Sequence, residues 1–143
     1  MKTSRIVGIG LGMMILVGLL LFPGEGVQSE AAEIKMRTYY IGFLKRGPEW
    51  TAERSPEVIK VSQGHRKNID DLLANGKLAL AGPFVTPADE GEGALAGLFL
   101  FDVSTEEEAL ALARADPAVI AGRFTIDVVT WYGPTGITYE GRE

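Results

Sequence analysis

The stretch SPEVIKVSQGHRKNIDDLLANGKLALAG, residues 55–82, predicts a helix followed by a short strand. Ser55 is suited to cap a helix, and the proline that follows it suits the first helical position. Asn75-Gly76 ends the helix, because glycine readily adopts the left-handed conformation found there. Lys77–Gly82 is then an apolar strand, closed by Gly82-Pro83. Between these signals, side chains recur at helical spacing at Ile59, Ser62, His65, Ile69, Leu72 and Leu73.

Further elements follow on both sides of this stretch. Residues 45–51 and 85–93 are predicted loops, and Asp116-Pro117 should end or kink the second helix, because proline disfavours helical geometry in the residue before it. The second helix opens at the capping box Ser104-Thr105-Glu106-Glu107. Three further strands are predicted at Met36–Leu44, Ala94–Val103 and Phe124–Tyr132. The resulting order, β-α-β-β-α-β, predicts an α+β protein of the ferredoxin-like class, with both helices on one face of the sheet.

The helix-free face of this sheet should be polar if water covers it. The strand sequences do not have a polar face. In the last predicted strand, Phe124, Ile126 and Val128 lie on one face, and Val129 and Trp131 lie on the other. Both faces are therefore apolar, and a second copy of the chain is the simplest cover for the helix-free one. The expectation is a homodimer, a dimeric α+β barrel.

The chain begins with a predicted export signal. Basic Lys2 and Arg5 precede the apolar run Ile6–Phe22, and Ser29-Glu30-Ala31 offers a small-x-small cleavage site. Residues 1–31 are therefore predicted to be a signal peptide of an exported protein, periplasmic or extracellular. An uncleaved anchor is the alternative, since the run is at the short limit for a membrane span. A folded domain is expected over residues 36–137. The chain from Gly133 should pack loosely, and residues 138–143 form a flexible tail.

Composition excludes several classes of function. The 143 residues carry a net charge of −5, so a nucleic-acid partner is not expected. The absence of cysteine excludes disulfides, cysteine–zinc sites and thiol nucleophiles. One histidine with scattered carboxylates gives no metal-ligand spacing. The chain also lacks a phosphate loop, a nucleophile elbow and a dinucleotide fingerprint, so no metal or cofactor is predicted.

His65, the one histidine, lies on the apolar side of the predicted helix, and Asp116 lies near the end of the second helix. Histidine is the side chain that changes charge nearest to neutral pH, and an aspartate beside it would set its tautomer. The alternatives are a core histidine bonded to a carbonyl and a turn aspartate bonded to its own backbone. Gly64 costs about 1 kcal/mol relative to alanine in mid-helix, which indicates close packing there.

Aromatic and basic residues are candidates for substrate binding. Trp50, Trp131 and Tyr132 could line a small-molecule pocket, although aromatic side chains serve equally in cores and interfaces. Arg46 could attract an anionic substrate, although solvated surface is the ordinary role of such a residue. The other basic candidates for this role are Lys45, Arg66 and Lys67.

Taken together, several blocks of the chain resemble the YciI-related (YCII) domain family. They are Arg46–Thr51, Gly64-His65, Gly76–Phe84, Gly97–Phe101, Asp116–Gly122 and Trp131–Pro134. The resemblance runs from about Arg37 to about Ile137. It implies a ferredoxin-like dimeric α+β barrel and an active-site pair, here His65 and Asp116. Some members look like lyases or isomerases of aromatic metabolites; most look cytoplasmic, whereas this chain carries an export signal.

The leading hypothesis is a small-molecule enzyme of lyase or isomerase type. In it, His65 is the general base, Asp116 orients the imidazole, and Arg46, Trp50 and Trp131 bind an aromatic or acidic substrate. One alternative is a non-catalytic ligand-binding or accessory dimer in which the pair only shapes a pocket. Another is a structural dimer with a core histidine. No contact with a membrane is expected except through residues 1–31.

Overall fold

The computed structural model describes residues 33–87 and 90–138. Four strands and two long helices follow one another in the predicted order, and a short third helix precedes the last strand. The elements are β1 (Met36–Arg46), α1 (Pro56–Ala74), β2 (Leu78–Pro83), β3 (Leu95–Phe101), α2 (Glu106–Arg114), α3 (Pro117–Ile120) and β4 (Phe124–Pro134).

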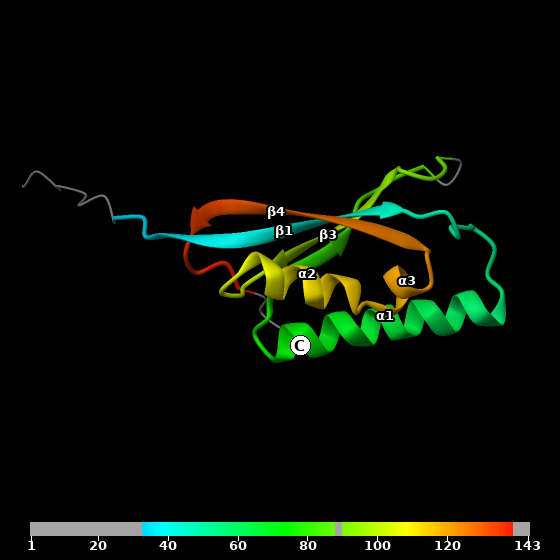
Figure 1. The fold of residues 1–143 in the computed structure, drawn as a ribbon, viewed down its shortest axis with the longest axis horizontal. Helices are drawn as coiled ribbons and strands as arrows, with labels where there is room; N and C mark the ends of the chain where they lie inside the picture. Colours follow the sequence, from blue (N-terminus) through cyan, green and yellow to red (C-terminus); the bar gives the residue numbers. More distant parts are fainter. Residues whose placement is uncertain (1–32, 88–89, 139–143) are drawn as a thin grey trace, which may run out of the picture. The chain divides into compact units, whose positions relative to one another are not determined.

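The strands form one antiparallel sheet in the order β2-β3-β1-β4. The two central strands, β1 and β3, are separated in sequence by α1 and β2. Along β1, Tyr40 lies opposite Phe101 of β3 and Thr130 of β4. All three helices lie on the same side of the sheet (Figure 1). This arrangement confirms the predicted ferredoxin-like α+β fold.

Helix α1 begins and ends where the sequence predicts. The Ser55 side chain accepts a hydrogen bond from the backbone N–H of Val58, and Pro56 occupies the first turn. At the other end, Asn75 is the C-cap and Gly76 has a φ of +67°. These are local signals, so the boundaries of α1 depend little on the rest of the fold.

The boundaries of other elements differ from prediction. The cap of α2 is Thr105, one residue later than the start of the predicted box, and the Glu108 carboxylate accepts from the backbone of Ser104. Asp116-Pro117 ends α2 as predicted, but it also begins α3.

The last strand also exceeds its predicted length. The prediction of loose packing from Gly133 is wrong, because β4 runs through Pro134 and Ile137 packs against the sheet. The cause is pairing with β1, since Gly133 lies opposite Arg37 in the ladder. Strand β1 is also longer than predicted. It extends to Arg46, which was expected to lie in a loop.

The sheet carries apolar side chains on both faces, as the alternation predicted. The helix-covered face holds the larger core, in which Phe99 and Phe101 meet Leu72 of α1 and Ala109 of α2. The helix-free face holds a smaller cluster that no helix contributes to. Its buried members are Tyr39, Ala79 and Leu100, and Ile41, Leu98, Trp131 and Ile137 pack against them.

The predicted signal, residues 1–31, lies outside the described residues, so export and cleavage stay predictions. Most of the predicted tail, residues 138–143, lies outside them as well. Among the helices that the structure describes, none is long and apolar enough to cross a membrane.

Candidate active site

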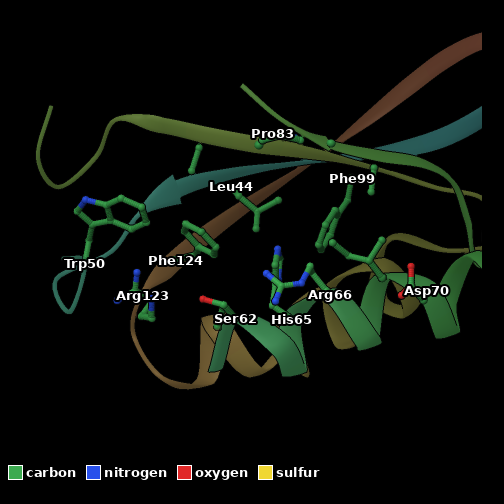
Figure 2. A pocket seen from close by; sticks show the side chains of 16 residues that line it. Leu44, Trp50, Ser62, His65, Arg66, Asp70, Pro83, Phe99, Arg123 and Phe124 are labelled. Atoms are coloured by element: carbon green, nitrogen blue, oxygen red, sulfur yellow. The ribbon is translucent and has the colours of Figure 1, made fainter. Parts of the chain in front are cut away.

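A cavity of about 630 Å³ lies between α1 and the sheet, on the helix-covered face (Figure 2). Its size is typical of a small-molecule site. The lining comes from α1, α3, all four strands, the loop after β1 and the turn before β4. The lining residues are Leu44, Trp50, Ser62, His65, Arg66, Ile69, Asp70, Ala81, Gly82, Pro83, Ala96, Gly97, Phe99, Ala118, Arg123 and Phe124.

His65 rises from α1 into this cavity. Its ring stacks on Phe99 at a centroid distance of 5.9 Å and meets Phe124 at 5.4 Å. The side chain is 19% exposed. It is therefore enclosed by aromatic rings but still open to the cavity, which a core histidine sealed against a carbonyl would not be.

Close contact between α1 and α3 brings His65 to Asp116. A Cβ atom on Gly64 would lie 3.2 Å from the Cβ of Pro117, tighter than most side-chain contacts. This confirms the close packing predicted at Gly64. Because each of these two residues is next to one member of the pair, the small size of Gly64 allows His65 and Asp116 to meet.

Asp116 is fully buried and accepts hydrogen bonds from three groups. Its two carboxylate oxygens, Oδ1 and Oδ2, each lie 2.9 Å from Nδ1 of His65. The Asn68 amide donates to Oδ2 at 2.9 Å. The backbone N–H of Ala118 donates to Oδ1 at 2.8 Å, which caps α3. Asp116 therefore has both roles considered from the sequence. It accepts a hydrogen bond from the backbone two residues further on, as a turn aspartate does, and it also holds His65.

These contacts determine the charge of Asp116. Burial alone would raise the pKa of its carboxyl, but the hydrogen bond and charge of His65, together with Ala118 and Asn68, outweigh burial and lower the pKa. An ionised carboxylate only accepts hydrogen bonds, so Nδ1 of His65 carries the shared proton. In the neutral ring Nε2 then holds the lone pair, and His65 can accept a proton from a molecule in the cavity.

Of the predicted substrate-binding residues, Trp50 lines the cavity and Arg46 does not. The Arg46 guanidinium is buried, and it donates through Nη1 to the backbone carbonyls of Pro87 and Glu90. It also lies 4.4 Å from the centre of the Trp50 ring. Arg46 therefore ties the end of β1 to the loop between β2 and β3 and packs on the Trp50 ring.

Trp131 lies on the opposite side of the sheet from the cavity. Its ring packs on Tyr39 at 5.8 Å, within the helix-free cluster. The predicted alternation of β4 already separated Trp131 from Phe124, so the sequence itself argued against placing both in one pocket. Its neighbour Tyr132 is 65% exposed and does not line the cavity.

The remaining basic candidates divide in the same way. Arg66 lines the cavity. Lys45 pairs with Asp127, and Lys67 pairs with Asp71 one helical turn away. Neither lysine lines the cavity. Of Lys45, Arg66 and Lys67, Arg66 is therefore the one that can contact a molecule bound there.

Sequence reasoning missed Asn68, Arg123, Phe99 and Phe124 as site residues. Asn68 follows His65 by three positions, so helical spacing could have placed it on the same face. Phe99 and Phe124 were recognised only as strand residues. Arg123 is buried because the turn before β4 packs against the loop after β1. These two segments are far apart in the chain, and a single sequence gives no signal for that contact.

The site combines a histidine held by a buried carboxylate with an enclosed aromatic cavity. Among the described residues, no group of three His, Asp or Glu side chains is arranged to hold a metal ion. The chemistry that these groups can perform by themselves is proton transfer to and from a small molecule.

Comparison with known proteins gives one family. The model of the YCII-related domain matches residues 41–132. No curated protein matches the chain. Among solved structures, the chain is similar to 5-chloro-2-hydroxyhydroquinone dehydrochlorinase of Burkholderia phenoliruptrix, in complex with 2,5-dihydroxybenzoquinone. The identity is 20%, the match covers 65% of this chain and 92% of that one, and the TM-score is 0.48.

Proposed function

This chain belongs to the YCII-related domain family, and from that membership and the geometry of its cavity we propose that it is a small-molecule enzyme. In this proposal His65 transfers a proton and Asp116 orients it. The observation that carries the proposal is the contact of 2.9 Å from both Asp116 oxygens to Nδ1, which leaves Nε2 for the cavity. A structural histidine also needs a hydrogen-bond partner, but His65 in addition lines the cavity and stays 19% exposed.

The proposed reaction begins with Nε2 of His65 taking a proton from an acidic C–H or O–H group of the substrate. The imidazolium that forms is stabilised by the adjacent Asp116 carboxylate, because both lie in a poorly solvated site. In an isomerase, His65 returns the proton to a different atom of the same molecule. In a lyase, the electron pair left by the proton forms a double bond as a leaving group departs.

A screen of small aromatic acids and phenols tests this proposal. We expect the wild type to convert at least one member, and His65→Gln to reduce conversion by about 10² to 10⁴, as is typical for loss of a general base. Glutamine can still donate to Asp116, so the fold should persist and ligand affinity should be kept. Unchanged conversion in His65→Gln would refute catalysis by His65. Binding without conversion in either protein would favour the non-catalytic alternative.

We also propose that two copies pair through their helix-free faces. Support comes from the apolar cluster around Tyr39 and from Val129, which is 44% exposed and lies opposite Ile41 on that face. Burying such a face gains free energy in proportion to its apolar area. No helix covers this face within the described residues. In this proposal, the same face of a second copy covers it.

Light scattering after gel filtration tests the dimer. The wild type should have twice the mass of one chain, and Val129→Glu should shift it towards one chain, because the new charge would be desolvated in the interface. Ile120→Glu is the matched control, since Ile120 is 72% exposed on α3, and α3 lies on the helix-covered side of the sheet (Figure 1). A wild type with the mass of one chain, or equal effects of the two changes, would contradict this interface.

A further inference from the structure

Arg123 is a buried charged side chain whose guanidinium is only partly used by the protein. It directly precedes β4, lines the cavity and is 8% exposed. Its Nη2 donates to the backbone carbonyl of Thr51 at 3.1 Å. Its Nη1 is buried and meets no hydrogen-bond acceptor among the residues that the structure describes. Buried donors without acceptors are rare in folded proteins because they are costly.

Arg46 shows what a purely structural arginine looks like in the same place. Both guanidinium groups lie over the ring of Trp50, at 4.4 Å for Arg46 and 5.0 Å for Arg123. Both side chains are buried. Arg46 directs Nη1 to two backbone carbonyls, whereas Arg123 directs Nη1 to none that is described. Packing against Trp50 therefore does not account for the unused nitrogen of Arg123.

The backbone around Arg123 is fixed by the loop that carries Trp50. The Gly47 N–H donates to the carbonyl of Arg123 at 2.9 Å, and the Glu49 N–H donates to that of Gly122 at 3.0 Å. A Cβ atom on Gly47 would collide with the carbonyl oxygen of Gly122. The backbone that carries Arg123 is thus held in place before any ligand arrives, which lowers the entropy lost on binding.

The walls beside Arg123 suit a flat ring. Trp50 and Phe124 stack with centroids 5.8 Å apart and planes inclined by 26°. Phe124 meets His65, and His65 stacks on Phe99 on its other side. Figure 2 shows this succession, with Arg123 below Trp50 and beside Phe124. A planar molecule lying along these rings could place one end at Arg123 and present an atom to His65.

The charges around Arg123 leave it free for an anion. The Glu49 side chain lies against Gly122, next to Arg123, but among the described residues it makes no ion pair with Arg123 and does not line the cavity. Asp70, the exposed acid that lines the cavity, lies at the opposite end from Arg123 in Figure 2. An adjoining hollow of about 330 Å³ shares Arg66 and Arg123 with the cavity, and there Glu53 is outnumbered by these two and Arg54. The fork of an arginine matches a carboxylate, and the contact strengthens where water is scarce.

We propose that Arg123 is the anion-binding residue of this cavity and that the ligand is a small planar carboxylate. A small rotation of the Arg123 side chain turns Nη1 to the cavity, where the carboxylate accepts its hydrogen bonds, and the ring lies against Phe124 and Phe99. The assignment of this ligand as the substrate rests on the proposed function, because His65 must reach the same molecule. Anion binding by Arg123 stands separately and is measured separately.

Calorimetric titration of the full-length protein tests the proposal, with benzoate, phenylacetate and cinnamate as probes and their neutral amides as controls. The wild type should bind at least one acid about tenfold more tightly than its amide, the gain expected from a charged hydrogen bond. Arg123→Met should remove that preference, because it lowers the affinity for the acid more than the affinity for the amide, whose carbonyl makes only a neutral-acceptor hydrogen bond. Arg46→Met should keep the preference, although we expect it to lower the urea midpoint of unfolding.

Two further variants separate the possible causes of failure. Arg123→Lys keeps a charge and should retain part of the preference, which guards against a folding defect in Arg123→Met. His65→Gln should keep the preference while losing conversion, so failure of the proposed reaction is distinct from failure of anion binding. A wild type without any preference for acids, or an Arg123→Met that keeps it, would overturn the proposal.

Discussion

Asp116 and Arg123 are both buried ionised groups near one cavity, but they meet it differently. Arg123 lines the cavity, whereas Asp116 does not and reaches it only through His65. Asp116 is 0% exposed and accepts hydrogen bonds from His65, Asn68 and Ala118. Arg123 is 8% exposed, and within residues 33–87 and 90–138 its Nη2 has a hydrogen-bond acceptor while its Nη1 has none. The first group is satisfied by the chain and should stabilise it. The second retains an unused donor, which stabilises nothing until a ligand supplies an acceptor.

The largest expected contrast is in stability. Asp116→Ala removes the cap of α3 and leaves three donors without their acceptor, so the free energy of unfolding should fall by about 3 kcal/mol. Arg123→Met removes one hydrogen bond and one contact with Trp50 but also a buried donor without an acceptor, so its free energy of unfolding should fall by clearly less than that of Asp116→Ala. Urea unfolding followed by circular dichroism measures both. Equal losses in the two variants would remove the distinction between the two groups.

A smaller effect is expected from the loop that holds Arg123. Gly47→Ala places a methyl group against the backbone of Gly122, and overpacking of this kind costs about 1 to 3 kcal/mol. Because the displaced segment carries Trp50 and Arg123, the preference for carboxylates over amides should also fall. Conversion of neutral ligands by His65 should be affected less.

Gly91→Ala is the matched control for that change. A Cβ atom on Gly91 meets nothing within 4 Å, and this glycine lies in an exposed loop. Its unfolding midpoint and its ligand preference should equal those of the wild type. If Gly47→Ala behaved like Gly91→Ala, the account of how Arg123 is positioned would be wrong.

The smallest expected effect is the dependence of stability on pH. The pKa of the Asp116 carboxyl lies below its ordinary value in the folded protein, because the three donors outweigh burial. Its stabilising contribution is therefore complete above the unfolded pKa of about 3.9 and is lost as the pH falls through the folded pKa. The difference in free energy of unfolding between the wild type and Asp116→Asn should shrink from pH 6 to pH 3. A difference that stayed constant would show that Asp116 is not the titrating group.

The elements around Asp116 were predicted from the sequence where local signals determine them. Helix α1 was predicted to the residue because Ser55, Pro56 and Asn75-Gly76 act through neighbouring backbone groups. The pairing of His65 with Asp116 was expected from the order of elements and from family resemblance. The short helix α3 was not predicted, because Asp116-Pro117 was interpreted only as an end and not also as a beginning.

Arg123 and Trp131 show where prediction from sequence failed. The burial of Arg123 results from hydrogen bonds between the turn at Gly122 and the loop at Gly47, which are far apart in sequence. Trp131 was grouped with Trp50 by residue type, although strand alternation placed it on the other face. Residue type therefore indicated candidate side chains, whereas long-range packing determines which of them line the cavity.

The most direct test of the central claim is solvent proton exchange. Each acid that binds is incubated with the enzyme in deuterium oxide, and deuterium at carbon is measured by nuclear magnetic resonance and mass spectrometry. We predict that the wild type exchanges or converts at least one of them, that His65→Gln slows the reaction by about 10² to 10⁴, and that His65→Gln still binds the acid. Exchange at the same rate in both proteins, or no exchange or conversion of any bound acid by the wild type, would contradict proton transfer by His65.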